Sequence, residues 1–180
     1  MNIVVPIKFV PDLVEELPTE AFIRLWDTTW LSLILNEFDD HAIEQAILLK
    51  EKKGGQVTVV AFETEGVDDA LYAAAAKGAD RLVKLTGELE TGMNNHTRAQ
   101  LLAATIAELQ PTLVLTGVQA HDDLDGPIGP LLAAHLKMPY VGYVAGVEVR
   151  DDRVGVLKEY PGGLVAQLEV TLPAVLGIQA

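Results

Sequence analysis

Short apolar runs of strand length alternate along this chain with longer segments whose apolar residues recur at helical spacing. The runs at 3–8 and 57–62 contain few polar residues, which indicates strands that are buried on both faces. Between them, Ala42, Ile43 and Ala46 recur every three or four residues and form the buried stripe of a helix. Because strands that alternate with helices pack as a parallel sheet, this pattern predicts the α/β class.

The expected architecture is a single domain over residues 1–180, with helices on both faces of a mainly parallel five-stranded sheet. The parallel core is expected to end at about residue 143, and the strand-like pattern of 144–180 predicts a C-terminal antiparallel β-meander. The strands of the core are expected near 3–8, 57–62, 81–85, 112–116 and 140–143.

The helix expected after residue 35 begins with a side chain that can cap it. We expect Asn36 to accept a hydrogen bond from the Asp39 amide. The Asp39 carboxylate lies in the first turn, where the helix dipole stabilises negative charge. Gly54 and Gly55 then end the helix, because glycine readily adopts the left-handed backbone found at helix ends.

The segment 13–35 has no clear periodicity. Residues 30–35 are compatible with a strand, and 21–26 with its hairpin partner. The part from Trp26 to Leu35 carries two tryptophans and several leucine and isoleucine residues, and such clusters mark interfaces when they are not buried internally. We therefore predict a partner surface that includes Trp30, with a hairpin packed on its own sheet as the alternative.

The composition excludes several classes of function. The net charge is −13 and no basic stripe offsets it, so nucleic-acid binding is not expected. The sequence has no run of about eighteen uncharged apolar residues, which predicts no membrane span. The absence of cysteine excludes disulfides and thiolate chemistry, and the N-terminus lacks the features of a signal peptide, so the cytoplasm is the expected compartment.

The sequence also lacks recognisable catalytic motifs. It contains no Gly-x-Ser-x-Gly elbow, Walker loop, His-Glu-x-x-His or Gly-x-Gly-x-x-Gly. His121, Asp122, Asp123 and Asp125 stand close together, but neighbouring residues rarely converge on one ion. We interpret them as a solvated acidic turn, and we expect no catalytic or metal-binding residues.

The most informative segment is the loop 117–130, which joins an expected parallel strand to an expected helix. Open α/β sheets bind ligands at this edge. Gly126 and Gly129 permit close approach of a ligand, and the amides of Ile128 and Gly129 are placed to face a phosphate at the start of the helix. The alternative is a glycine-rich turn that only closes the fold.

Four segments carry a resemblance to a known family. They are 3–12 with its Val-Pro-Asp turn, 36–46 (Asn-Glu-Phe-Asp-Asp-His-Ala-Ile-Glu-Gln-Ala), Gly-Ala-Asp-Arg at 78–81, and Leu-Thr-Gly-Val-Gln-Ala-His-Asp-Asp at 115–123. In order and near-family spacing, over almost all of the chain, these segments resemble the electron transfer flavoprotein beta family.

The resemblance implies an adenine-nucleotide-binding type of fold and a role as the beta subunit of a heterodimer. In that family the alpha subunit holds most of a redox-active FAD, which takes electrons from a flavin-linked dehydrogenase and passes them to an acceptor. The beta subunit holds AMP as a structural ligand, or a second FAD in the electron-bifurcating branch. Carried over to this sequence, the nucleotide site comprises Pro6, Asn36, Phe38, Asp39, Phe62, Gly117, Gln119, Ala120, Asp122, Gly126, Ile128 and Gly129.

Departures from the family predict a weakened AMP site. Asp125 and Glu63 place negative charge near the expected phosphate, and Pro127 has no amide hydrogen to donate. The family's C-terminal arm, which embraces the alpha subunit, is expected to be missing after Ala180. Two other functions stay open: a nucleotide-binding sensor or stress-protein-like module without flavin, and a structural subunit with an empty pocket.

Overall fold

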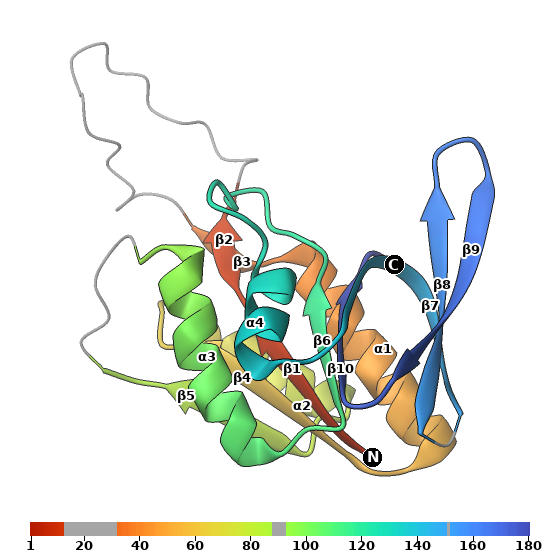
Figure 1. Cartoon of the computed structure of the whole chain (residues 1–180). Helices are drawn as coiled ribbons and strands as arrows, with labels where there is room; N and C mark the ends of the chain where they lie inside the picture. The colour runs from red at the N-terminus through yellow and green to blue at the C-terminus, as the bar shows by residue number, and fades with distance from the viewer. Residues whose placement is uncertain (13–31, 88–92, 151) are drawn as a thin grey trace.

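A computed structural model of the protein describes residues 1–12, 32–87, 93–150 and 152–180. Within these ranges one continuous sheet has the strand order β5-β4-β1-β6-β10-β7-β8-β9 (Figure 1). Its parallel part consists of β5 (Arg81–Leu85), β4 (Gln56–Phe62), β1 (Asn2–Ile7), β6 (Leu113–Gly117), β10 (Ala174–Ile178) and β7 (Tyr140–Arg150). The predicted α/β class with a mainly parallel sheet is therefore confirmed.

Helices cover both faces of this sheet, as predicted. α1 (Glu37–Lys53) and α2 (Val67–Lys77) pack on one face, and α3 (Asn95–Leu109) and α4 (Ile128–Leu136) pack on the other. Because successive side chains of a strand point to opposite faces, Val5 of β1 packs with α1 and Val4 packs with α3 and α4. Both side chains are fully buried, so β1 is the centre of two hydrophobic cores.

The helix ends follow from local chemistry. α1 stops where Gly54 takes a φ of +72°, and α2 stops where Gly78 takes a φ of +123°, both conformations that glycine adopts without strain. α3 begins after Asn94, whose side chain accepts a hydrogen bond from the Thr97 amide at 2.9 Å. The starts of α1 and α3 lie at the same edge of the sheet, beside the carboxyl ends of the parallel strands (Figure 1).

The C-terminal region contains the predicted meander and one parallel strand more than predicted. The first part of β7 is parallel to β10, and its later part is antiparallel to β8 (Arg153–Tyr160), which pairs with β9 (Leu164–Thr171). After β9 the chain returns to the core, and β10 inserts between β6 and β7. Every residue of β10 is buried, which is the signature of a central parallel strand and not of a meander edge.

A short antiparallel pair stands beside the main sheet. β2 (Phe9–Pro11) pairs with β3 (Leu33–Leu35), so the strand expected at 30–35 has its described partner directly after β1. The expected partner at 21–26 and Trp30 of the predicted partner surface lie outside the described residues. Among the described residues, no helix is both long enough and apolar enough to cross a membrane.

Candidate functional site

A cavity of about 440 Å³ opens at the carboxyl ends of β1, β4 and β6. This volume falls within the range of ~300–1,000 Å³ that is typical of small-molecule sites. Several of the predicted site residues line it, namely Pro6, Asn36, Asp39, Phe62, Gly117, Gln119, Ala120, Asp122 and Ile128. The sequence thus located the edge of the sheet that forms a cavity.

Three predicted residues lie off the described lining. Phe38 packs edge-on against the ring of His41, with ring centroids 6.2 Å apart. Gly129 is buried against Tyr140 and Thr116, and a Cβ at this position would lie 2.8 Å from the Tyr140 ring. Gly126 has a φ of +109° and turns the loop, while its carbonyl accepts from Asn95 Nδ2 at 2.9 Å.

Asp39 ties two strand ends together beneath the cavity. Its Oδ2 accepts from the Lys8 amide at 2.8 Å, and its Oδ1 accepts from the Gly117 amide at 2.9 Å. Burial raises the pKa of Asp39 from 3.8 to about 7, against the lowering effect of the two amides and of the Asn36 side chain. Asp39 therefore fixes the ends of β1 and β6 from the first turn of α1.

Asn36 does not cap α1 with its side chain, and that prediction was wrong. Its backbone carbonyl accepts from the amides of Asp39 and Asp40, which starts the helix without the side chain. The side-chain Nδ2 donates instead to the Gln119 carbonyl at 3.0 Å. The Asn36 side chain therefore binds the loop after β6, because that loop passes directly over the start of α1.

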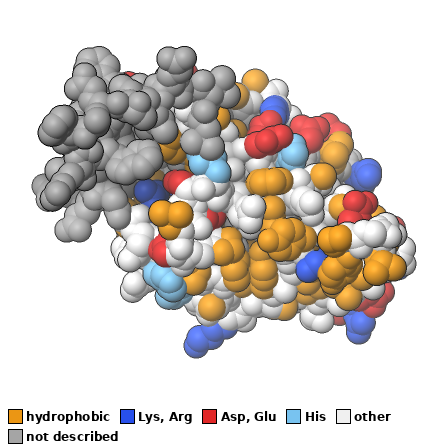
Figure 2. Space-filling model, turned by 90° about the horizontal axis from the view of Figure 1, so that it is seen from above, with side chains coloured by type: hydrophobic (Ala, Val, Ile, Leu, Met, Phe, Trp, Pro, Cys, Tyr) orange, Lys and Arg blue, Asp and Glu red, His pale blue; other side chains and the backbone are white. Residues whose placement is uncertain are grey.

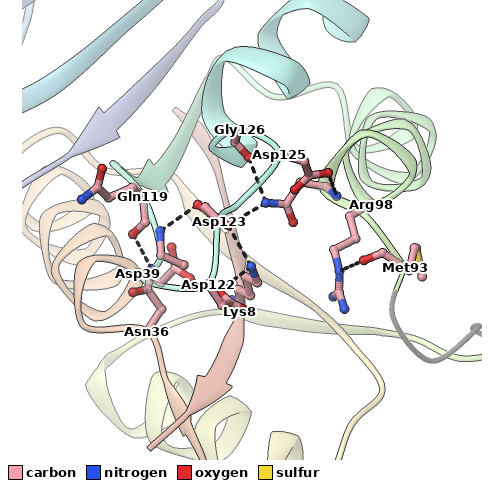
Figure 3. Close-up of polar contacts among 12 residues, drawn as sticks. Lys8, Asn36, Asp39, Met93, Arg98, Gln119, Asp122, Asp123, Asp125 and Gly126 are labelled. Carbon is pink, nitrogen blue, oxygen red and sulfur yellow. Dashed lines mark hydrogen bonds and ion pairs between the residues drawn. The ribbon is translucent and has the colours of Figure 1, made fainter. Parts of the chain in front are cut away.

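Lys8 neutralises two aspartates of the loop that follows β6 (Figure 3). Its Nζ lies 2.7 Å from Asp122 Oδ1 and 2.8 Å from Asp123 Oδ1. Asp123 also accepts from Asn95 Nδ2 at 2.6 Å and from the Ala120 amide at 2.7 Å. The Asp123 side chain is 5% exposed, so the prediction of a solvated acidic turn was wrong for this residue.

Asp125 has a partner that the sequence did not reveal. Its Oδ2 accepts from the Asn95 amide at 2.7 Å, at the first residue of α3. A carboxylate at this position satisfies a free helix amide and interacts favourably with the helix dipole. Asp125 therefore joins the loop after β6 to the start of α3.

Arg98 and Phe62 form a wall of the cavity. The Arg98 Cζ lies 5.6 Å from the centroid of the Phe62 ring, within cation–π range, and Arg98 Nε donates to the Met93 carbonyl at 3.1 Å. Arg98 and Lys8 are both lining residues that the sequence prediction missed. Lys8 follows the first strand directly, which was an available signal, whereas the position of Arg98 depends on how α3 packs.

The described lining of the cavity contains threonine but no serine, cysteine or histidine. It does contain Thr116, whose Oγ1 is buried and has no hydrogen-bond partner among the described residues. The hydroxyl faces Gly129, since a Cβ at position 129 would lie 2.9 Å from it.

The fold and the cavity define a class: an α/β protein with a ligand-sized cavity at the carboxyl edge of a parallel sheet. A family model for the electron transfer flavoprotein domain matches residues 31–180. The chain belongs to the electron transfer flavoprotein family.

Named relatives agree over nearly the whole chain. The electron transfer flavoprotein subunit beta of Clostridium acetobutylicum is 35% identical over 179 residues, which are 98% of this chain and 67% of the relative. The corresponding subunit of Thermoanaerobacterium thermosaccharolyticum is 34% identical over 176 residues, again 98% and 67%. Protein FixA of Azorhizobium caulinodans is 31% identical over 190 residues, covering 98% of this chain and 65% of FixA. The chain thus spans about two thirds of the length of these relatives.

Proposed function

We propose that this chain is the beta subunit of a heterodimeric electron transfer flavoprotein and that its cavity binds AMP. In this role the alpha-type subunit holds most of the FAD, which carries electrons from a dehydrogenase to an acceptor. The observation that carries the proposal is the cavity at the ends of β1, β4 and β6, in a chain that aligns along 98% of its length with proteins named as beta subunits.

The cavity suits a mononucleotide in size and chemistry. Its volume of about 440 Å³ is that of a small-molecule site, and Pro6 and Phe62 supply apolar surface for a base. The amide side chain of Gln119 adds polar groups that fix orientation. When bound, AMP supplies no redox chemistry; it fills the cavity and stabilises the fold around it.

A separate apolar hollow supports a protein partner. It has a volume of about 460 Å³ and lies between the start of α4, the start of β7 and the meander. Hydrophobic side chains gather on this molecule's surface in Figure 2. The lining of the hollow includes the exposed side chains of Tyr143 and Leu168. Lys158 lies over the rings of Tyr143 and Tyr160, at 5.5 and 5.3 Å, and keeps them in place. We propose that the alpha-type subunit covers this hollow.

Co-expression with the cognate alpha-type subunit tests the proposal. We expect an equimolar complex with flavin absorbance, and a colourless preparation when this chain is purified alone. A stoichiometrically flavinylated preparation of this chain alone would favour a second FAD in place of AMP. Failure to form any complex with the alpha-type subunit would contradict the proposed role.

Calorimetry with AMP separates two versions of the function. Heat of binding with the chain or its complex supports the AMP site. No heat at millimolar AMP for either preparation indicates a structural subunit with an empty pocket, and the electron-transfer role then rests on the complex alone.

A further inference from the structure

The charges of the cavity are unevenly compensated. The described lining carries Lys8 and Arg98 as cations, and Asp39, Glu63, Asp122 and Asp123 as acidic residues. Lys8 is held between the carboxylates of Asp122 and Asp123 at 2.7 and 2.8 Å, so its charge is already neutralised. Among the described lining residues, Arg98 is the cation that has no carboxylate partner.

Arg98 is also held in a defined position. Its aliphatic stem leaves α3 and its guanidinium lies over Phe62, 5.6 Å from the ring centroid. One of its five N–H donors, on Nε, is used by the Met93 carbonyl at 3.1 Å, and this is the contact drawn for Arg98 in Figure 3. The terminal nitrogens keep their donors without a partner among the described residues. A planar, pre-positioned fork of this kind matches the oxygens of a phosphate or carboxylate.

The start of α4 offers few hydrogen-bond donors to a bound anion. Gly129 is packed against Tyr140 and Thr116, and Pro127 has no amide hydrogen. Asp125 adds a carboxylate to the same loop. A phosphate at the start of α4 therefore finds fewer donors and more negative charge than a phosphate at Arg98.

We propose that Arg98, positioned by Phe62 and Met93, binds the phosphate of the nucleoside monophosphate in this cavity. The inference rests on the proposed AMP site and assigns its anion to a side chain of α3. It gives the acidic cavity a local charge that selects a nucleotide over a nucleoside.

The test compares AMP with adenosine, which lacks the phosphate, by calorimetry on the 180-residue chain. We expect Arg98→Gln to weaken AMP binding about tenfold to a hundredfold and to weaken adenosine binding by much less. Arg81→Gln is the matched control, because Arg81 is exposed at the start of β5, away from the cavity, and loses the same charge. Arg98→Lys keeps the charge without the planar fork, so we expect an intermediate loss for AMP.

Each outcome decides the assignment. Equal AMP-to-adenosine ratios in the native chain and Arg98→Gln overturn the role of Arg98 while the AMP site stands. If neither compound binds the native chain, the AMP site and the role of Arg98 both fail. Thermal unfolding verifies that Arg98→Gln and Arg98→Lys are folded. If Arg98→Gln is unfolded, Arg98→Lys decides the question. A native ratio of AMP to adenosine affinity in Arg98→Lys, at both high and low salt, then also overturns the assignment.

Discussion

The Asp39 carboxylate accepts a hydrogen bond from the Gly117 amide at 2.9 Å and joins the first turn of α1 to the end of β6. The two residues are so close that a Cβ at position 117 would lie 2.5 Å from Asp39 Oδ1 and 2.9 Å from the Phe38 carbonyl carbon. Glycine is required at 117 because the loop after β6 must pass directly against the helix start.

This contact predicts a large effect of Gly117→Ala. Overpacking of a buried site costs about 1–3 kcal/mol, and displacement of Asp39 adds the loss of its hydrogen bonds. We expect the free energy of unfolding to fall by about 3 kcal/mol, measured by urea denaturation. Gly155→Ala is the control, since its Cβ would meet the Glu148 carbonyl oxygen at 3.5 Å, an ordinary contact. Equal losses in the two variants would falsify this account of Gly117.

The raised pKa of Asp39 predicts a pH dependence of stability. The folded pKa is about 7 and the ordinary value is 3.8, so the folded state retains a proton that the unfolded chain has lost. The stabilising contribution is therefore present below pH 4 and is lost as the pH rises through about 7, with a slope of up to about 1.4 kcal/mol per pH unit. Asp39→Asn should show a flatter profile between pH 4 and 7. A native profile that rises relative to Asp39→Asn over this range contradicts the assignment.

Lys8 should be structurally important because it compensates a buried carboxylate. Removing one partner of a buried pair costs about 3–5 kcal/mol, and the Lys8 and Asp123 side chains are 13% and 5% exposed. We expect Lys8→Met to lower the free energy of unfolding by about 3 kcal/mol and Asp123→Asn to restore part of it in the double variant. Lys77→Met, which breaks an exposed pair with Asp40, should change it by less than about 1 kcal/mol. No recovery in the double variant would show that Lys8 acts through its packing.

The sequence predicted the α/β fold because its strands are apolar on both faces and its helices have clear ends. The sequence analysis did not predict β10. Strand propensity contains no information about strand order, and an apolar segment that follows a meander is interpreted as part of that meander. The prediction for Asn36 failed for a related reason. A helix cap and a tie to a distant loop require the same residue type, and only the proximity of the Gln119 carbonyl distinguishes them.

The lining of the cavity was predicted where the backbone determines it and missed where long side chains do. Gly117, Gln119 and Pro6 lie at strand ends, so the topology alone brings them to the cavity. Arg98 reaches the cavity from the first turns of α3, and its partner Phe62 is distant in sequence. A pattern along one helix contains no information about such a contact.

The apolar hollow gives a prediction for assembly. Leu168 lines it and is 40% exposed, and Leu101 on α3 is also 40% exposed but lies away from it. We expect Leu168→Asp to weaken association with the alpha-type subunit by at least tenfold, because transfer of a charged carboxylate from water into an interface has a large desolvation cost. Leu101→Asp should leave association unchanged, as measured by titration of the two purified subunits. The reverse order of effects would move the interface to the α3 face.

Asp125 provides the last prediction, because its carboxylate has two opposing effects. It caps the start of α3 through the Asn95 amide at 2.7 Å, and it adds negative charge to the loop that precedes α4. Serine also accepts a hydrogen bond from a helix amide, so Asp125→Ser should lower the free energy of unfolding by no more than about 1 kcal/mol. A unit charge about 4–8 Å from a phosphate costs roughly 0.5–1 kcal/mol in water, so with the phosphate at Arg98 the removal of the Asp125 charge should strengthen AMP binding about twofold and at most about fivefold. Asp125→Asn should have the same effect on AMP, and neither variant should change adenosine binding.

Asp152→Ser, in the turn between β7 and β8, removes an equal charge far from the cavity and should leave AMP binding as it is. If Asp125→Ser and Asp152→Ser bind AMP equally well, the charge of Asp125 does not act on the phosphate, and the weakness predicted for this site has another origin.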